Sequence, residues 1–225
     1  MDIRGLQTSP HGLWVFDNDG TLYRGTETLR KAVEEKMICF ISQHFRISRE
    51  EAVEKRECLL RQYQTKYTLI ALKGEGIDPD LFIAETYLAV DPRACGIVRD
   101  RRLHEVLSDL VGEKVVLTNN PAPFARMIFK ELGIEGLISH VYGMAELSYL
   151  SKPHPSTFRL VQRAQENDIP VVYVDDHLDN ILAVHALGVS TVLVGGGDAM
   201  KAPGYHISSL NEAEVTYVGA QRAIV

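Results

Sequence analysis

The segment 13–22, LWVFDNDGTL, constrains the fold of this chain more than any other stretch. Its first four residues are apolar and predict a buried parallel strand, and Gly20 lets the backbone turn after the strand ends. Asp17 and Asp19 are then expected at the carboxyl end of a central strand, where open α/β sheets bind ligands. Two carboxylates that face one pocket can divide nucleophilic attack and proton transfer between them.

The same Asp-x-Asp-Gly run has two other interpretations. A calcium-binding loop would require aspartate or asparagine at position 21, glycine at 22 and glutamate at 28. The chain has Thr21, Leu22 and Thr28 at these positions, which excludes that loop. A solvent-exposed turn without chemistry stays open as an alternative at this point.

Apolar runs alternate with helical patterns in the rest of the chain. After the first strand, the sequence predicts strands over 114–119, 138–142, 170–176 and 190–194, and helices over 100–111, 122–133, 155–167 and 178–187. This alternation predicts an α/β fold with a parallel sheet and right-handed crossovers. We expect the strand order 5-4-1-2-3, which places Asp17 at the centre. Residues 198–225 are expected to be irregular, with a short sixth strand at 205–207.

The segment after the first strand has a different pattern. Apolar residues at helical spacing predict a helix over 27–45. Ser48 and Glu51 form a capping box that opens a second helix, over 49–63. A further helix is expected to begin at Asp78-Pro79, with the aspartate as cap.

These patterns predict two domains within the 225 residues. A helical domain, 24–95, is inserted into an α/β core formed by 1–23 and 96–225. That length is sufficient for a substantial hydrophobic core.

Composition excludes several classes of protein. The net charge of −6 and the absence of a basic tract argue against binding to a nucleic-acid polymer. No apolar run approaches the ~20 residues that span a bilayer, and no secretory pattern opens the chain. The three cysteines, Cys39, Cys58 and Cys95, form no CxxC pair. We therefore expect a cytoplasmic protein without membrane contact.

Polar residues follow the later predicted strands. Thr118 and Asn119 can hold a phosphoryl oxygen through a hydroxyl and backbone N–H groups, although this segment can equally cap the next helix. Lys152 is followed by Pro153 and Pro155, which stiffen the chain around it. A lysine fixed in this way is a candidate phosphate ligand, with a solvated charge as the alternative.

Adjacent carboxylates, Asp175 and Asp176, end the fourth strand. Unit charges ~4 Å apart interact by about 4 kcal/mol at an effective dielectric constant near 20. Convergence of these two with Asp17 and Asp19 would therefore be unfavourable without a cation. An all-oxygen site that also faces phosphate suits Mg²⁺.

Four ordered motifs resemble those of the haloacid dehalogenase (HAD) superfamily: Asp17-x-Asp19-x-Thr21, Thr118, Lys152 and Asp175-Asp176. The resemblance implies that Asp17 is a nucleophile that forms an aspartyl-phosphate. It implies that Asp19 is the general acid and base. Thr118, Lys152 and the backbones of Asn119 and Gly20 are then expected to bind phosphate. The implied metal-binding residues are Asp17, Asp19 (through its main-chain carbonyl), Asp176 as a direct ligand, and Asp175 as a ligand or its support.

The helical insertion resembles the C1 cap of that superfamily, and in detail the cap of pyrimidine 5'-nucleotidase-type members. The likeness rests on Tyr63-x-x-x-Tyr67, on the segment 74–82, on Leu22-Tyr23 and on 117–119. Gly20 departs from the asparagine that is common in those members. Candidates for stacking on a base or ribose are Tyr63, Tyr67, Phe82 and Tyr87, with a place in the core as the alternative for each, and Tyr23 is expected to line the mouth of the site.

The expected function is that of a Mg²⁺-dependent phosphatase. It would hydrolyse a small phosphorylated metabolite through an aspartyl-phosphate, with a pyrimidine nucleoside 5'-monophosphate as the expected substrate. Alternatives are a phosphoglycolate or sugar-phosphate phosphatase, a phosphomutase and a non-catalytic HAD-like binding protein. A dehalogenase is disfavoured, because that chemistry needs no acid such as Asp19 for an alkoxide leaving group.

Overall fold

The computed structural model describes residues 2–6, 9–195, 202–211 and 216–218. In the core, the strands are β1 (Leu13–Phe16), β2 (Glu113–Leu117), β3 (His140–Tyr142), β4 (Val171–Asp175), β5 (Ser190–Val194), β6 (Gly204–Ile207) and β7 (Thr216–Val218). Its α-helices are α5 (Arg101–Asp109), α6 (Ala122–Leu132), α7 (Arg159–Glu166) and α8 (Leu178–His185). Short 3₁₀ turns lie at Ile3–Leu6, Glu135–Leu137 and Pro155–Phe158.

The seven strands form one sheet in the order β3-β2-β1-β4-β5-β6-β7. β1 pairs in parallel with β2 and with β4, so that Val15 lies opposite both Val115 and Tyr173. The expected order 5-4-1-2-3 is confirmed within this longer sheet. Asp17 therefore follows a central strand, as the sequence predicts.

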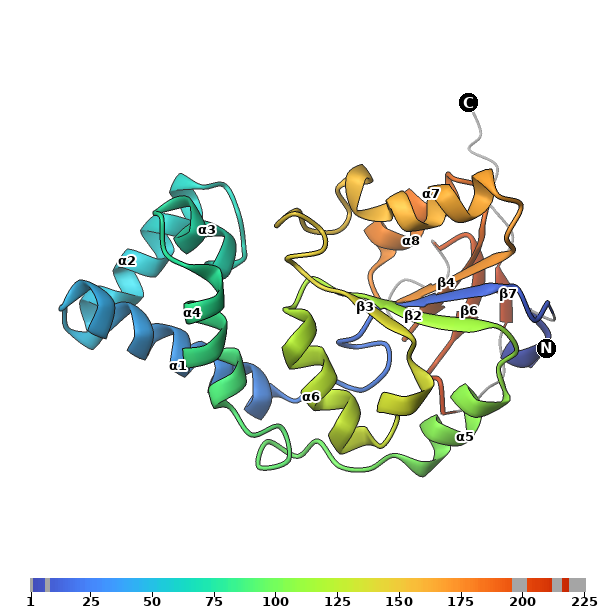
Figure 1. Ribbon diagram of the computed structural model, residues 1–225, viewed down its shortest axis with the longest axis horizontal. Coiled ribbons are helices and arrows are strands. Elements are labelled where there is room, and N and C mark those ends of the chain that lie inside the picture. The colour runs from blue at the N-terminus through green and yellow to red at the C-terminus, as the bar shows by residue number, and fades with distance from the viewer. Residues whose placement is uncertain (1, 7–8, 196–201, 212–215, 219–225) are drawn as a thin grey trace. The chain divides into compact units, whose positions relative to one another are not determined.

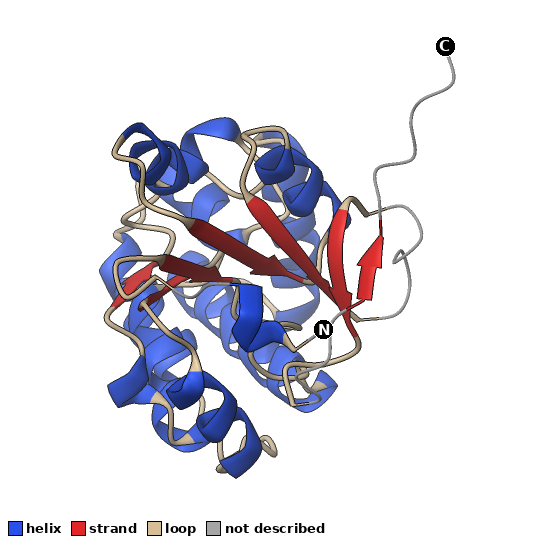
Figure 2. Ribbon diagram, turned by 90° about the vertical axis from the view of Figure 1, so that its right-hand side faces the viewer, coloured by secondary structure: helices blue, strands red, loops and turns tan. Residues whose placement is uncertain are grey.

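Helices cover both faces of the sheet (Figures 1 and 2). In Figure 1, α7 and α8 lie on one face, and α5 and α6 lie on the other. All four residues of β1 are buried, and alternate residues face opposite layers. Leu13 and Val15 pack in one cluster with Phe158 and Ile181. A strand covered on both faces needs a continuous apolar run, which is what segment 13–16 provides.

The expectation that 198–225 is irregular apart from one short strand is partly wrong. β6 pairs in parallel with β5, and β7 pairs antiparallel with β6. The expected strand at 205–207 is confirmed as β6, and the strand that the sequence did not predict is β7, which has only three residues and pairs at the sheet edge. Residues 198–201, 212–215 and 219–225 of this tail lie outside the described residues.

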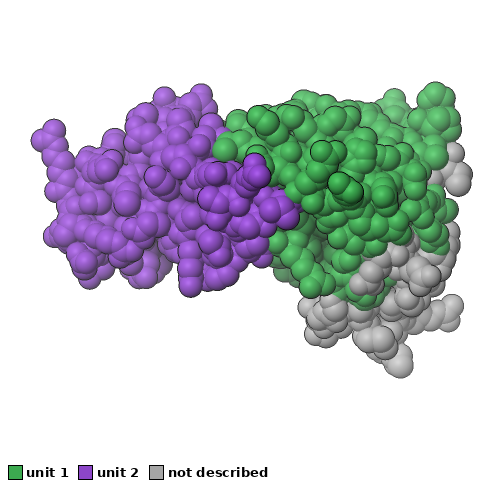
Figure 3. Space-filling view, turned by 90° about the horizontal axis from the view of Figure 1, so that it is seen from below, with its two compact units in different colours: residues 1–24, 99–225 green, residues 25–98 purple. Residues whose placement is uncertain are grey.

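The chain divides into two compact units, shown in different colours in Figure 3. One comprises 1–24 and 99–225, and the other comprises 25–98. The sequence places the corresponding boundaries at 23/24 and 95/96. The second unit contains no strand among its residues, all of which the structure describes.

The second unit consists of α1 (Glu27–Phe45), α2 (Arg49–Gln62), α3 (Thr68–Gly74), α4 (Pro79–Glu85) and the 3₁₀ turn Tyr87–Ala89. Local signals set the helix starts. Ser48 accepts a hydrogen bond from the Glu51 N–H at 3.1 Å, and Glu51 accepts one from the Ser48 N–H at 2.7 Å. Asp78 caps α4, as expected. Among the described residues, no helix combines the length and the apolar character needed to cross a membrane.

Candidate active site

Asp17 leaves the sheet directly after β1, between the ends of β2 and β4. Its N–H donates to the Val174 carbonyl at 2.8 Å, which extends the parallel pairing to the aspartate itself. The following turn brings Gly20 against Asp176. Gly20 has φ +89°, and a Cβ atom there would lie 2.2 Å from the Asp176 Oδ2 atom. Glycine is therefore required both for the backbone conformation and for the close approach of the two loops.

A buried lysine joins two of the predicted aspartates. Lys152 Nζ lies 2.6 Å from Asp17 Oδ1 and 2.8 Å from Asp175 Oδ2. The lysine side chain is 1% exposed, so its charge is compensated by these carboxylates rather than by solvent. Burial alone would lower the pKa of Lys152, but the charges of Asp17 and Asp175 outweigh it and raise that pKa above its ordinary value. The solvated-charge interpretation of Lys152 is therefore wrong.

Asp17 and Asp175 share that lysine unequally. Burial raises the pKa of Asp17 to about 8, and the ammonium of Lys152 opposes this rise. Burial would also raise the pKa of Asp175, but the charge of Lys152 and several hydrogen bonds hold it below its ordinary value. Asp175 therefore stays ionised beside the lysine, whereas burial favours a proton on Asp17. A divalent cation would lower the pKa of Asp17 in turn.

Donors surround the carboxylate of Asp175. Oδ2 accepts from the Tyr173 hydroxyl at 2.6 Å as well as from Lys152, and Oδ1 accepts from the His177 N–H at 2.8 Å. Asn180 Nδ2 lies 3.1 Å and 3.0 Å from the two oxygens. Asp175, expected as a metal ligand or its support, therefore has hydrogen-bond donors at both carboxylate oxygens and pairs with Lys152.

Asp19 occupies a separate cradle. Its Oδ2 accepts from Asn120 Nδ2 at 2.8 Å and from Asn18 Nδ2 at 3.1 Å, while its Oδ1 accepts from the Tyr23 hydroxyl. Burial raises the pKa of Asp19, and the hydrogen bonds from these three side chains oppose the rise. A general acid must hold a proton and then release it, and here burial favours the protonated form while the three donors favour the carboxylate.

The segments predicted to bind phosphate lie beside this cluster. Thr118 is 1% exposed, and its Oγ1 accepts from the Asn120 N–H at 3.1 Å. Asn119 Oδ1 accepts from the Lys152 N–H at 2.8 Å, so the Asn119 side chain anchors the backbone that carries the lysine. The Gly20 N–H donates to the Tyr23 carbonyl at 2.9 Å, within its own loop. The Thr21 hydroxyl donates to Asp17 Oδ2 at 3.3 Å.

The aromatic residues considered for stacking divide into two groups. Phe82 and Tyr87 lie in the core of the helical unit, with Phe82 making edge-to-face contacts to Phe40 and Tyr87. Tyr23 is buried and its hydroxyl is committed to Asp19. For Phe82 and Tyr87 the core interpretation is correct, and Tyr23 lies beside the candidate catalytic acid. Tyr63 and Tyr67 are only half-buried.

The acidic groups fit a divalent cation. Ligand atoms of Asp175, Asp176 and His177 lie within 4.8 Å of one another. Asp176 is half-buried and is bonded to exposed His177 at 2.9 Å, whereas the oxygens of Asp175 already accept several hydrogen bonds. The Lys152 ammonium pairs with Asp17 and Asp175, and burial raises the pKa of both Asp17 and Asp19. Hard oxygen donors with uncompensated charge are the set that Mg²⁺ prefers.

Sequence reasoning missed four supporting residues: Asn18, Asn120, Tyr173 and Asn180. Asn120 directly follows the predicted pair Thr118-Asn119, so its place at the end of β2 was a usable signal. Tyr173 lies two residues before Asp175 on the same strand, and therefore on the same face of the sheet. Asn180 lies on α8, four residues after Asp176. Its contact with Asp175 depends on how the chain turns from β4 into that helix, which the sequence does not show.

Comparison with known proteins agrees with this geometry. The family described as haloacid dehalogenase-like hydrolases matches residues 13–188, which include every member of the cluster. There is no match among curated proteins.

Solved structures share the fold at low sequence identity. A HAD phosphatase from Thermococcus onnurineus is 19% identical, with a TM-score of 0.59 over 89% of this chain and 95% of its own. A 2-haloacid dehalogenase from Pseudomonas syringae pv. Tomato DC3000 is 20% identical, with a TM-score of 0.56 over 90% and 96%. The magnesium-bound HAD-hydrolase YfnB from Bacillus subtilis is 17% identical, with a TM-score of 0.54 over 90% and 96%. By the family match across most of its length, the chain belongs to the haloacid dehalogenase-like hydrolases.

Proposed function

We propose that this hydrolase is a phosphatase that acts on a small phosphomonoester and uses Mg²⁺. The observation that supports this most directly is the pair of environments given to Asp17 and Asp19. Asp17 lies 2.6 Å from Lys152, and Asp19 is held by three neutral donors. One carboxylate thus lies beside a cation, as suits a nucleophile, and the other is buried without a paired cation among the described residues, where burial favours a proton and the three donors favour its release.

In the proposed reaction, a carboxylate oxygen of Asp17 attacks phosphorus while the bond to the leaving oxygen breaks. Asp19 gives its proton to that oxygen, so the product is an alcohol and the enzyme carries an aspartyl-phosphate. Asp19, now ionised, takes a proton from water as the water attacks phosphorus, which releases inorganic phosphate and restores Asp17. Lys152 stays beside Asp17 and offsets negative charge on the phosphoryl group.

Asp17, the main-chain carbonyl of Asp19 and Asp176 are the residues we propose to hold Mg²⁺. The bound ion supplies positive charge that lets an anionic nucleophile approach an anionic substrate. Asp175, Tyr173 and Asn180 serve by keeping Lys152 in place.

Dehalogenases share this fold, so the distinction from them rests on Asp19. A halide leaves without a proton, whereas an alkoxide requires an acid. The cradle formed by Tyr23, Asn18 and Asn120 around a buried Asp19 favours the phosphatase. Phosphomutase and non-catalytic binding remain the alternatives.

The experiment is phosphate release from a panel of phosphomonoesters with Mg²⁺ and with excess EDTA, alongside chloride release from 2-chloropropionate. Asp17→Asn should lose phosphate release almost completely and remain folded, because an amide is nearly isosteric with the carboxylate and Asp175 still pairs with Lys152. Activity retained by Asp17→Asn, full activity in EDTA, or chloride release as the main reaction would each contradict the proposal.

The proposed substrate is a pyrimidine nucleoside 5'-monophosphate, UMP or CMP. This rests on the resemblance of segment 63–82 to pyrimidine 5'-nucleotidase-type caps. The structure narrows the stacking candidates to Tyr63 and Tyr67, since Phe82 and Tyr87 lie in the core. The measurement is kcat/KM for UMP and CMP against AMP, phosphoglycolate and glucose 6-phosphate. A clear preference for phosphoglycolate or the sugar phosphate would reject the nucleotide and leave the phosphatase chemistry intact.

A further inference from the structure

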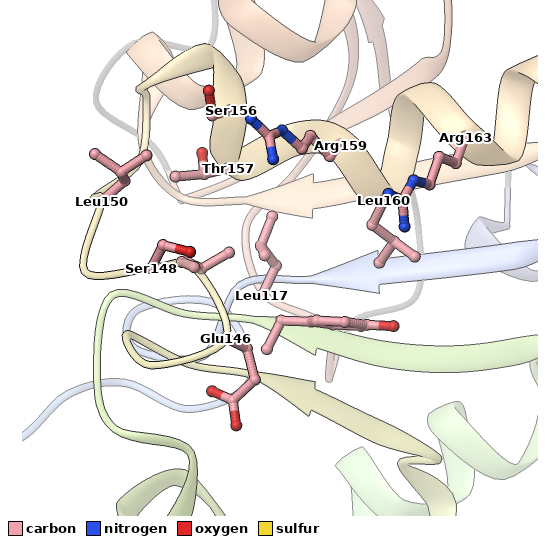
Figure 4. A pocket seen from close by; sticks show the side chains of 11 residues that line it. Leu117, Glu146, Ser148, Leu150, Ser156, Thr157, Arg159, Leu160 and Arg163 are labelled. Carbon is pink, nitrogen blue, oxygen red and sulfur yellow. The ribbon is translucent and has the colours of Figure 1, made fainter.

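A cavity of about 320 Å³ lies between α7 and the strands β2 and β3, and we call it the α7 pocket (Figure 4). Its apolar lining includes Leu117, Leu147, Leu150 and Leu160. Its volume is in the range of small-molecule sites, which are mostly apolar with a few convergent polar groups. None of its lining residues takes part in the Asp17 cluster.

The wall of the α7 pocket is continuous in sequence with the candidate active site. Leu117 directly precedes Thr118, and Leu150 lies two residues before Lys152. On the other side of the lysine, the Thr157 hydroxyl donates to the His154 carbonyl at 2.6 Å. The backbone of the segment before Lys152 is strained, because Ser148 has φ +56° and the residue after it has φ +60°. An occupant would therefore contact the chain on both sides of Lys152.

Two arginines give the α7 pocket its charge. Arg159 and Arg163 are four residues apart on α7 and therefore lie on one side of that helix. Figure 4 shows both arginines and Leu160 projecting from α7 on the side of the cavity. Among the residues that the structure describes, neither guanidinium forms a salt bridge.

The acidic residue of the pocket does not neutralise this pair. Glu146 Oε2 accepts from the Gly143 N–H at 3.0 Å. In Figure 4 its carboxylate points away from α7. Two positive charges thus face the pocket, against one carboxylate that is engaged in a turn.

A second cavity, of about 240 Å³, shares Tyr142, Leu160 and Arg163 with the α7 pocket. Burial and nearby Glu113 raise the pKa of the Tyr142 hydroxyl, and the charge of Arg163 opposes them. The charge of Arg163 therefore acts on Tyr142, which lines both cavities. There is room for an apolar group beyond the arginines.

We propose that the α7 pocket binds a small organic anion, separate from the substrate. Its carboxylate, sulfonate or phosphate group meets the guanidiniums of Arg159 and Arg163, and its apolar part lies on the leucine side chains. Guanidinium groups bind such anions through paired, charge-assisted hydrogen bonds. The apolar lining favours an anion that carries a ring or an alkyl group over inorganic phosphate.

The test is a fluorescence titration of the full chain with 8-anilinonaphthalene-1-sulfonate, in excess Mg²⁺ and inorganic phosphate. N-phenyl-1-naphthylamine is the matched neutral probe, because it has the same rings without the sulfonate. We expect the sulfonate to bind saturably, with one site per chain. The neutral probe should bind more weakly, by a factor of about ten or more. Arg159→Gln/Arg163→Gln should weaken sulfonate binding by about tenfold or more.

Two further variants separate this site from others. Arg101→Gln removes an exposed arginine from α5 and should leave the affinity unchanged. Leu160→Trp fills the cavity and should abolish binding even if the arginine variant proves unstable. Asp17→Asn should bind the probe like the wild type, so this result does not depend on whether the chain is a phosphatase. Equal binding of both probes, equal affinity of the arginine variants and Arg101→Gln, or unchanged binding to Leu160→Trp would overturn the proposal.

Discussion

Three side chains donate to Asp19, and together they fix the direction of its carboxylate. Tyr23 is the one among them with a hydroxyl, and its burial leaves that hydroxyl no other role in the described structure. Burial raises the pKa of Tyr23, and the charge of Asp19 raises it further, so the tyrosine stays a donor. Orientation of an acid matters most when the leaving group requires a proton.

Tyr23→Phe should therefore slow the hydrolysis of an alkyl phosphate more than that of p-nitrophenyl phosphate. Proton transfer contributes about 10²–10⁴-fold to the rate. Loss of one hydrogen bond that orients the acid should lower kcat for the alkyl phosphate by about tenfold. The measurement is kcat for both substrates, with Tyr87→Phe, at a tyrosine in the core of the helical unit, as the control. An equal loss on both substrates would show that Tyr23 supports the loop rather than the acid.

Asp175 and Asp176 are neighbours with different surroundings, and substitution should separate them. Asp175→Asn leaves Lys152 with one buried counter-charge and should lower the free energy of unfolding by about 1–3 kcal/mol. Asp176→Asn should change that free energy little and raise the Mg²⁺ concentration for half-maximal activity by about tenfold or more. Denaturant titration without metal and Mg²⁺ titration of phosphate release measure the two effects.

If Asp175→Asn instead raised the Mg²⁺ requirement and Asp176→Asn lowered the stability, Asp175 would be the metal ligand. A shift in Mg²⁺ dependence for Asp175→Asn, with its stability unchanged, would have the same meaning. The pair therefore tests the division between ligand and support within one dipeptide.

The sequence pointed to the charged residues of the cluster, and it did not point to the neutral side chains that donate hydrogen bonds to them. Asp17, Asp19 and Lys152 are recognisable because charges in ordered motifs have few other uses. Asn120 and Asn180 are amides that cap or pack in most proteins. Their contacts follow from how β2 and β4 continue into α6 and α8, which the sequence does not specify.

Among the elements, α2 shows how local chemistry decides a helix start. The capping box of Ser48 and Glu51 is complete, with both reciprocal hydrogen bonds formed. Ser48→Ala should lower the free energy of unfolding by about 1 kcal/mol. Denaturant titration checks this value, with Ser108→Ala on α5 as the control. No difference between the two variants would show that tertiary contacts alone hold α2.

The same box predicts a pH dependence. Hydrogen bonds from Ser48 lower the pKa of Glu51 from its usual value near 4.5. The folded state then binds fewer protons than the unfolded state, so this contribution is present above about pH 4.5 and is lost as the pH falls through the folded pKa. The difference in stability between wild type and Glu51→Gln should shrink from pH 6 to pH 3. A constant difference over this range would contradict the charge-assisted bond, and Glu50→Gln serves as the control.

At the scale of the whole molecule, the hydrophobic pattern predicted the central strands of the sheet better than the short C-terminal strands. Long apolar runs such as 13–16 and 170–174 identify central strands because both of their faces are buried. β7 is an edge strand and β6 lies between it and β5, and neither of these short strands is a continuous apolar run like that of β1. The limits of the helical insertion differed by only a few residues because the change from strand to helix patterns is abrupt there.

The position of β1 between β2 and β4 has a consequence for synthesis of the chain. The ribosome releases β1 before the whole of 25–98, yet the last partner of β1 arrives only with β4. At about 5–20 residues per second, this interval is on the order of ten seconds. A nascent chain has Asp17 and Asp19 throughout that time, without Lys152 or Asp175 to organise them. Assembly of the cluster is therefore a single late event, and a message cut short before codon 152 yields a chain with the whole first motif and no finished centre.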